Sequence, residues 1–193
     1  MKKIALLAIT AAAAIATPAM AQSTTGTIII NGTVGNKCTV LTGTGTAATW
    51  GGTVNLGELS QADGTLRSSS SLSTDFAAAG SGVLQARIVC TSANPSITVN
   101  ADPLVNTAPV TAGQGYTNTV HFQADVAVTK VSGSSTFSND SNAATTGPTA
   151  VGDRLAATGN NVSVSTTNWR TVGTDTQLVS GNYQGQIVVT IAP

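Results

Sequence analysis

The sequence predicts an all-β protein built as an antiparallel β-sandwich, and three observations carry this prediction. Short runs of alternating apolar and polar residues recur along the 193-residue chain, and Gly, Asn, Asp and Pro separate these runs. Thr, Ser, Gly, Ala, Val and Asn dominate the composition. Alternation with a period of two is typical of strands that bury one face, and the separating residues are those that tight turns prefer. At this length we expect one domain.

Charged residues are few, at 8% of the chain, and no cluster of Lys or Arg occurs. Two of the eight basic residues lie within the first three positions, so the rest of the chain carries a small negative net charge. Such a chain offers no basic surface to the phosphates of nucleic acid or to anionic lipid. We therefore expect no nucleic-acid partner.

Residues 1–21 are typical of a secretory signal peptide. Lys2 and Lys3 precede an apolar run, and Ala19-Met20-Ala21 is a cleavage motif of small residues. The apolar run is too short for a stable membrane span. We therefore expect an exported, soluble chain that starts at Gln22 and does not insert into a membrane, and the style of the signal indicates a bacterial source.

The segments expected to form strands share the alternating pattern and end at turn residues. They are residues 26–34, 52–59, 83–90, 96–101, 119–128, 161–165 and 182–192. The apolar face expected for residues 119–128 consists of Val120, Phe122, Ala124, Val126 and Val128. Residues 72–80 favour a short helical turn, and the polar, turn-rich residues 132–150 favour a surface loop or short hairpin.

The first of these segments, GTIIINGTV, lies only a few residues after the expected cleavage site. Its even positions are Gly26, Ile28, Ile30, Gly32 and Val34, and its odd positions are mostly polar. A strand with one apolar face needs a surface on which to bury it. The pattern alone leaves open whether that surface belongs to the same chain or to another.

The two cysteines, Cys38 and Cys90, are expected to form a disulfide because an exported chain meets an oxidising compartment. Closing a loop of this size stabilises a fold by roughly 4 kcal/mol in the chain-entropy model. Two free buried thiols are the alternative. A zinc site is less favoured, since two thiolates are too few ligands and no His lies near either of them in sequence.

Residues that could support catalysis or metal binding are sparse. His121 is the one histidine, and its position opposite Val120 and Phe122 in the strand pattern predicts an exposed or edge residue. No G-x-S-x-G motif occurs, and Asp140 stands among amides with too little charge for a tight calcium site. We therefore expect no enzyme activity, catalytic residue, metal or cofactor. Trp50 and Trp169 could stack on sugar, but such residues are more often partly buried anchors.

The order of these features resembles the subunits of chaperone–usher pili, and most of all archaic-type rod subunits with a spore-coat-U-type domain. The resemblance rests on the signal peptide, the alternating segment with an internal Gly, and four further stretches. These stretches are GNKCTV (35–40), GTVNLGEL (52–59), ARIVCTSANPSITV (86–99) and SGNYQGQIVVTIAP (180–193).

This resemblance implies an incomplete immunoglobulin-like sandwich, residues 35–193, that lacks its last strand and is completed in trans. Residues 22–34 would be a donor-strand extension that enters the groove of a neighbouring subunit. Its inserted positions would be Ile28, Ile30 and Val34, with Gly32 where the groove is shallow or the backbones pass closely. The groove wall would be formed by Ile187, Val189 and Ile191, and Cys38–Cys90 would tie the first strand to the second.

The resemblance also implies partners and a location. A periplasmic chaperone would fill the groove first, an outer-membrane usher would exchange it for the next subunit, and a head-to-tail homopolymer would form a pilus at the cell surface for adhesion and biofilm formation. An additional strand at the front and a missing strand after Pro193 fit such a contact. One alternative is a self-contained secreted β-sandwich that binds carbohydrate or coats the cell. Another is a tip adhesin, which would need a further receptor-binding domain.

Overall fold

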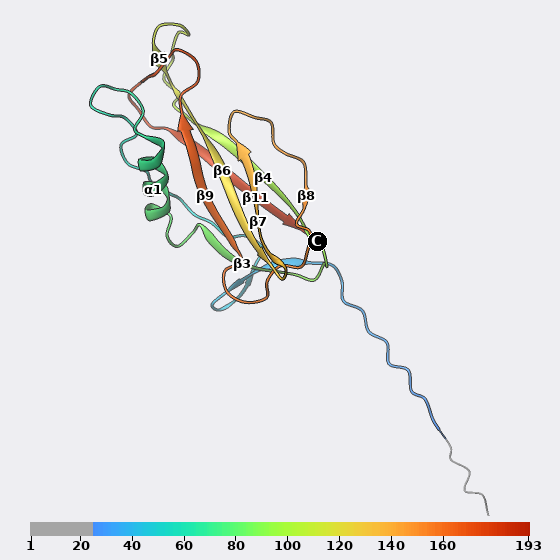
Figure 1. Ribbon diagram of the computed structural model, residues 1–193. Coiled ribbons are helices and arrows are strands. Elements are labelled where there is room, and N and C mark those ends of the chain that lie inside the picture. Colours follow the sequence, from blue (N-terminus) through green and yellow to red (C-terminus); the bar gives the residue numbers. More distant parts are fainter. Residues whose placement is uncertain (1–24) are drawn as a thin grey trace, which may run out of the picture. The chain divides into compact units, whose positions relative to one another are not determined.

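The computed structural model describes residues 25–193 (Figure 1). These residues belong to two units, with the boundary between Thr33 and Val34. The expected signal peptide and the start of the expected donor-strand extension lie outside the described residues. In the first unit, residues 25–33 form no helix or strand and their side chains are exposed.

The second unit, residues 34–193, consists mainly of β-strands with a single helix among its residues (Figure 1). The strands are β1 (Cys38–Thr42), β2 (Gly45–Ala47), β3 (Gln85–Cys90), β4 (Ser96–Val105), β5 (Tyr116–Thr117), β6 (Thr119–Lys130), β7 (Gly133–Asp140), β8 (Thr149–Ala150), β9 (Val162–Arg170), β10 (Gln177–Leu178) and β11 (Gln184–Ala192). The helix is α1 (Ser69–Ala79). The prediction of an all-β protein is confirmed.

The main sheet has the strand order β11-β4-β6-β9-β3-β1-β2, with β7 paired to β6 and β8 paired to β4. Every pair in it is antiparallel. Only the small β5–β10 pair is parallel among the described strands. The antiparallel arrangement expected from the alternating pattern is therefore present.

Strand β6 connects two parts of this sheet. Its first residues pair with the end of β4, through Val120 opposite Leu104, and its later residues pair with β7 and β9. In Figure 1, β4 and β11 pass behind β6 and β9. Side chains from both parts belong to one hydrophobic core, so this core lies between them.

The core follows the alternation read from the sequence. All five apolar positions of the expected face in β6 are buried, and the same alternation buries Ile97, Val99 and Ala101 in β4. Burying a large aliphatic side chain contributes about 1.5–3 kcal/mol. The alternation therefore identifies the strands, and burial of its apolar side chains is the main source of stability.

Helix α1 begins three residues before the helical turn expected at 72–80. Ser68 caps it, because its hydroxyl oxygen accepts a hydrogen bond from the Ser71 amide at 3.2 Å. Leu72 and Phe76, four residues apart on one face, are buried in the core. The helix ends at Ala79, and the amide of the C-cap residue Gly80 donates to the Phe76 carbonyl oxygen.

The polar region 132–150 forms both a hairpin strand, β7, and a loop, since residues 141–148 lie in no helix or strand. Strand β7 pairs with β6 along its whole length, from Gly133 opposite Lys130 to Asp140 opposite Gln123. Its inward positions Phe137 and Asn139 alternate with exposed Ser and Thr. A hairpin was one of the two expectations for this region, and its length follows from the length of β6.

The expected disulfide is confirmed. Cys38 and Cys90 are bonded and lie directly opposite each other in the β1–β3 ladder. Their bond closes a sequence separation of 52 residues. It therefore fixes the register of β1 against β3 immediately before the chain turns toward residues 48–60.

One expected strand is not formed. Residues 52–59 alternate as a strand does, yet residues 48–59 pair with no other strand in the described chain. Pairing resumes only at Ser60, which forms a bridge with Leu66. The apolar side chains of this segment are buried or half-buried, but its backbone pairs with no neighbouring strand.

Candidate binding groove

A groove with a volume of about 1240 Å³ opens between two stretches of the second unit that are far apart in sequence. One wall is residues 48–60, and the other runs from Leu178 to Val189, which includes the first two thirds of β11. The floor between the walls is lined by Phe76, Val83, Leu84, Leu104, Phe122, Val164 and Trp169.

The first wall is an extended segment with its apolar side chains turned toward the core. Val54 and Leu56 are half-buried and pack against the core, and Leu59 is buried. Gly52 lies against the side chain of Val83, since a Cβ at residue 52 would come within 2.7 Å of the Val83 Cγ1 atom. The segment is thus fixed by its side chains while its backbone forms no ladder.

The second wall is an edge strand. Strand β11 pairs with β4 from Gln184 to Ala192, and no other described strand pairs with it. A strand has hydrogen-bonding groups on both edges, so the second edge of β11 presents unpaired N–H and C=O groups. The half-buried Ile187, Val189 and Ile191 pack against the core from this strand.

The start of β11 is pressed closely onto β4. A register shift occurs between Gln184 and Gln186, and a Cβ at Gly185 would lie 2.7 Å from the Pro103 carbonyl oxygen. Gly185 is therefore required by the close approach of the two backbones. Asn106 holds the preceding chain, since its side-chain amide donates to the Ser180 carbonyl oxygen at 3.0 Å.

The floor is aromatic at its centre. The rings of Phe122 and Trp169 are stacked, and both residues are buried. The Trp169 indole N–H donates to the Thr166 hydroxyl at 3.2 Å, so its polar atom is satisfied inside the core. Trp169 is buried and Trp50 is half-buried, and both belong to or pack against the core, as expected for partly buried anchors.

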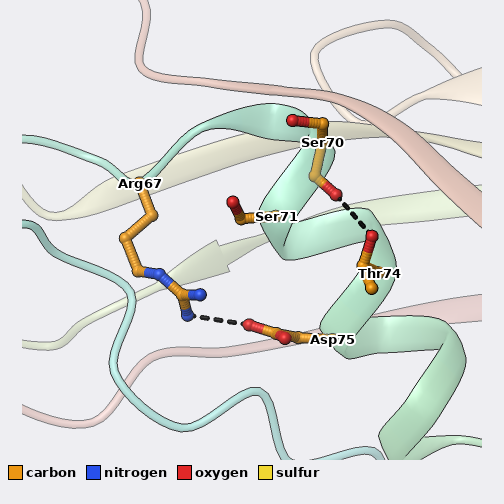
Figure 2. Close-up of a pocket in the computed structure, with 5 residues that line it drawn as sticks. All are labelled: Arg67, Ser70, Ser71, Thr74 and Asp75. Carbon is orange, nitrogen blue, oxygen red and sulfur yellow. Dashed lines mark hydrogen bonds and ion pairs between the residues drawn. The ribbon is translucent and has the colours of Figure 1, made fainter.

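Arg67 fastens the end of the first wall to helix α1. Its guanidinium donates to the Glu58 carbonyl oxygen at 2.9 Å and forms an ion pair with Asp75 at 2.8 Å. Figure 2 shows this ion pair beside a small hollow of about 280 Å³ lined by Arg67, Ser70, Ser71, Thr74 and Asp75. The guanidinium charge at this hollow is therefore paired with the Asp75 carboxylate.

The large groove is nearly uncharged. Glu58 is the one charged side chain among its lining residues within 25–193. A hydrogen bond from the Ser60 hydroxyl, followed by one from the Ser60 amide, lowers the pKa of the Glu58 carboxyl, which is fully exposed. At the other wall, burial raises the pKa of the Tyr183 hydroxyl, which donates to the Val179 carbonyl oxygen at 2.9 Å. A partner held by charge does not fit such a surface.

Two of the three residues expected to form the groove wall line the groove. Ile187 and Val189 line the groove, whereas Ile191 packs against the core beyond it. The residues expected in the donor strand lie in no strand, and Ile28, Ile30 and Val34 are exposed at 88%, 90% and 78%. Gly32 is exposed as well. Residues 26–34 therefore expose large apolar side chains to water, as a segment that binds an apolar surface does.

His121 contacts a serine hydroxyl at the end of the β6–β7 hairpin opposite its turn. The His121 Nδ1 atom lies 3.4 Å from the Ser141 hydroxyl oxygen, which itself accepts the Phe122 amide at 2.9 Å. Asp140 pairs with Arg170 at 2.8 Å rather than with the imidazole. Burial lowers the pKa of His121. These contacts close the end of the β6–β7 hairpin.

Several groove residues were not found from the sequence. The floor combines Phe76, Phe122 and Trp169, which come from α1, β6 and β9 and share no sequence motif. No sequence motif indicated a role for Arg67, because that role depends on its contacts with Glu58 and Asp75. The groove itself was expected from the resemblance to pilus subunits, which implied a wall at Ile187, Val189 and Ile191.

Comparison of the chain with protein-family models, with curated proteins and with solved structures gave no match. Within residues 25–193, no helix is long and apolar enough to cross a membrane. The same residues contain no group of three or more His, Cys, Asp or Glu side chains that could hold a metal ion.

Proposed function

We propose that this chain is a structural subunit of a chaperone–usher-type pilus and that it polymerises by donor-strand complementation. The observation that carries the proposal is the groove between residues 48–59 and β11, which has an unpaired backbone on each side and an apolar floor. A strand placed in such a groove would find hydrogen-bonding partners along both of its edges. The fold would then be an immunoglobulin-like sandwich that lacks one strand.

The walls of the groove run in opposite directions. Residues 48–60 lead to Thr65, which forms a bridge with Gln177 shortly before β11 begins. The first wall therefore ends where the second wall starts. An inserted strand would be antiparallel to one wall and parallel to the other, and a β-ladder can form in either direction.

Residues 25–34 supply a segment of suitable chemistry. Side chains alternate along a strand, so Ile28, Ile30 and Val34 would enter the groove together while Ile29, Asn31 and Thr33 face away. The groove is lined by one charged side chain, and residues 25–34 contain none. Burial of three aliphatic side chains would contribute about 4.5–9 kcal/mol before the loss of chain entropy.

A contact between the front of one subunit and the groove of the next is heterologous and need not close, so it yields a filament. In the proposed pathway a periplasmic chaperone occupies the groove first, and an outer-membrane usher exchanges it for the next subunit. The finished homopolymer is a pilus at the cell surface that supports adhesion and biofilm formation. The disulfide fits this exported route.

The first test compares two purified chains, one from Gln22 onward and one that also lacks residues 22–34. Each is examined by size-exclusion chromatography and on unheated SDS gels, and a synthetic peptide of residues 22–35 is then added. We expect SDS-resistant ladders from the longer chain. The shorter chain should remain monomeric and gain thermal stability when the peptide binds.

A matched pair of variants tests the face of the donor strand. Ile28→Asp places a charge on the face that would enter the groove, whereas Ile29→Asp places the same charge on the opposite face. We expect Ile28→Asp to abolish the ladders and Ile29→Asp to leave them. Equal effects of the two substitutions would contradict the proposed insertion.

A stable full-length monomer that ignores the peptide, together with a shorter chain that unfolds, would favour the self-contained β-sandwich instead. That alternative has less support at Trp169. Its ring stacks on Phe122 and is only 5% exposed, which is too little open face for a sugar ring to stack on.

A further inference from the structure

Asn31 and Gly32 form the one Asn-Gly dipeptide in the 193 residues. Both residues are exposed, and residues 25–33 take part in no helix or β-ladder. Glycine has no side chain to shield its amide nitrogen, so this nitrogen can approach the preceding side-chain carbonyl freely. The dipeptide therefore combines the two conditions that favour cyclisation of an asparagine.

The chemistry needs only water. The Gly32 amide nitrogen attacks the Asn31 Cγ atom, a new N–C bond forms, and the side-chain nitrogen leaves with a proton as ammonia. Water then opens the resulting five-membered imide at either carbonyl. One opening yields aspartate, and the other yields isoaspartate, in which the backbone passes through the side-chain carbon. No oxidant or reductant is consumed.

We propose that Asn31 is a deamidation site of the unassembled subunit and that the reaction limits how long the subunit can donate its strand. The second half of this inference rests on the proposed donor-strand function. Asn31 lies on the face that points away from the groove, so aspartate there leaves Ile28, Ile30 and Val34 in phase. Isoaspartate inserts an additional backbone carbon between Ile30 and Val34, and Val34 then loses its phase with Ile28.

Assembly would protect the dipeptide. A strand between two walls has a hydrogen-bonding partner for each backbone amide, so the Gly32 nitrogen is held in a ladder and cannot reach the Asn31 side chain. The chain contains an internal comparison. Asp63-Gly64 can form the same imide, but it does so by loss of water and far more slowly from an ionised carboxylate, and the Gly64 amide already donates to the Gln61 carbonyl oxygen at 3.0 Å.

The experiment ages two forms of the full chain in mildly alkaline buffer. The Ile28→Asp chain serves as the form that does not polymerise, and the unsubstituted chain is aged after polymerisation. Peptide mapping by mass spectrometry locates aspartate and isoaspartate, and released ammonia is measured in parallel. We expect modification at position 31 in the monomeric form, no isoaspartate at Asp63, and a rate at least about tenfold slower in the polymer, as for a backbone amide that must first open.

A second arm tests the effect on assembly. Asn31→Gln, which cyclises far more slowly, and Asn31→Asp should both polymerise fully after ageing. The aged Ile28→Asp chain cannot be used here, because it does not donate its strand. The unsubstituted chain is therefore aged as a monomer at high dilution and compared with these two variants. It should polymerise less in proportion to its isoaspartate content.

The outcomes separate this inference from the proposed function. An Asn31 that stays intact in the monomeric chain overturns the deamidation site, whether or not polymers form. Modification of the monomer without any polymer leaves the site standing and removes its link to assembly, because the pilus proposal itself has then failed. Equal rates in monomer and polymer contradict the protection.

Discussion

The ring of Trp169 stacks on the ring of Phe122 with 4.7 Å between their centroids and 26° between their planes. The two residues belong to β9 and β6, and both line the floor of the groove. A stacked aromatic pair adds about 0.5–1.5 kcal/mol to the burial of its area. The pair thus stabilises the subunit and also forms part of the surface on which a bound strand would lie.

This dual role predicts a difference between two phenylalanines. Phe122→Leu should lower the free energy of unfolding by about 1–2 kcal/mol and should also weaken binding of the peptide of residues 22–35. Phe137→Leu in β7 should lower stability to a similar extent and leave peptide binding unchanged, because Phe137 does not line the groove. Urea denaturation with and without the peptide measures both quantities. Equal loss of peptide binding in the two variants would contradict the assignment of the floor.

The disulfide predicts a large effect on stability. Replacing both cysteines, with Cys38→Ser and Cys90→Ser, removes a bond that closes a sequence separation of 52 residues. We expect the free energy of unfolding to fall by about 4 kcal/mol, as the chain-entropy model gives for a loop of this length. Denaturation of the oxidised chain, the reduced chain and the double variant tests this value, and the last two should agree.

How much was predictable from the sequence depends on how local the cause is. The alternation in residues 119–128 places one side chain after another, so the buried face of β6 follows from local pattern. The disulfide follows from two cysteines and an export signal. Residues 52–59 have the same local pattern, but a strand also needs a partner strand, and no described strand pairs with this segment. The side-chain pattern of a segment does not show whether it has a partner strand.

The buried amides are a second case in which local pattern fails. Asn139 and Asn161 are buried in this chain although Asn is usually exposed. Their partners are backbone groups of β4 and β3, which are distant in sequence. Only the folded arrangement shows that these side chains replace missing ladder hydrogen bonds.

Asn161 provides a test of this replacement. Its side chain accepts the Ile88 amide at 2.8 Å and donates to the Ile88 carbonyl oxygen at 2.7 Å. Asn161→Leu would leave both groups buried without a partner, so we expect a loss of about 2–4 kcal/mol in the free energy of unfolding. Asn160→Leu, at the exposed neighbour, should stay within about 0.5 kcal/mol. Thermal or urea unfolding of both variants decides the point.

The Asp140–Arg170 pair predicts a loss of stability in acid. A hydrogen bond from Arg170 lowers the pKa of the Asp140 carboxyl below its ordinary value of 3.8. A carboxyl whose pKa is lower in the folded than in the unfolded state contributes stability above about pH 4, and that contribution is lost as the pH falls through the folded pKa. Asp140→Asn should therefore reduce the decline of the urea midpoint below about pH 4. In an Arg170→Gln background, the same substitution should have little further effect on that decline.

Hydrogen exchange of the backbone amides provides the most direct test of the groove walls. In the chain that lacks residues 22–34, the amides of residues 48–59 and the outer edge of β11 have no ladder partner, so they should exchange rapidly. Addition of the peptide of residues 22–35 should slow exchange in both segments together, since an inserted strand bonds to both walls. The amides of β7 and β9 that face β6 already lie in ladders and serve as the internal control. Protection of β11 alone would mean that the peptide adds to one edge without filling the groove, and protection of neither wall would remove the basis of the proposed polymer.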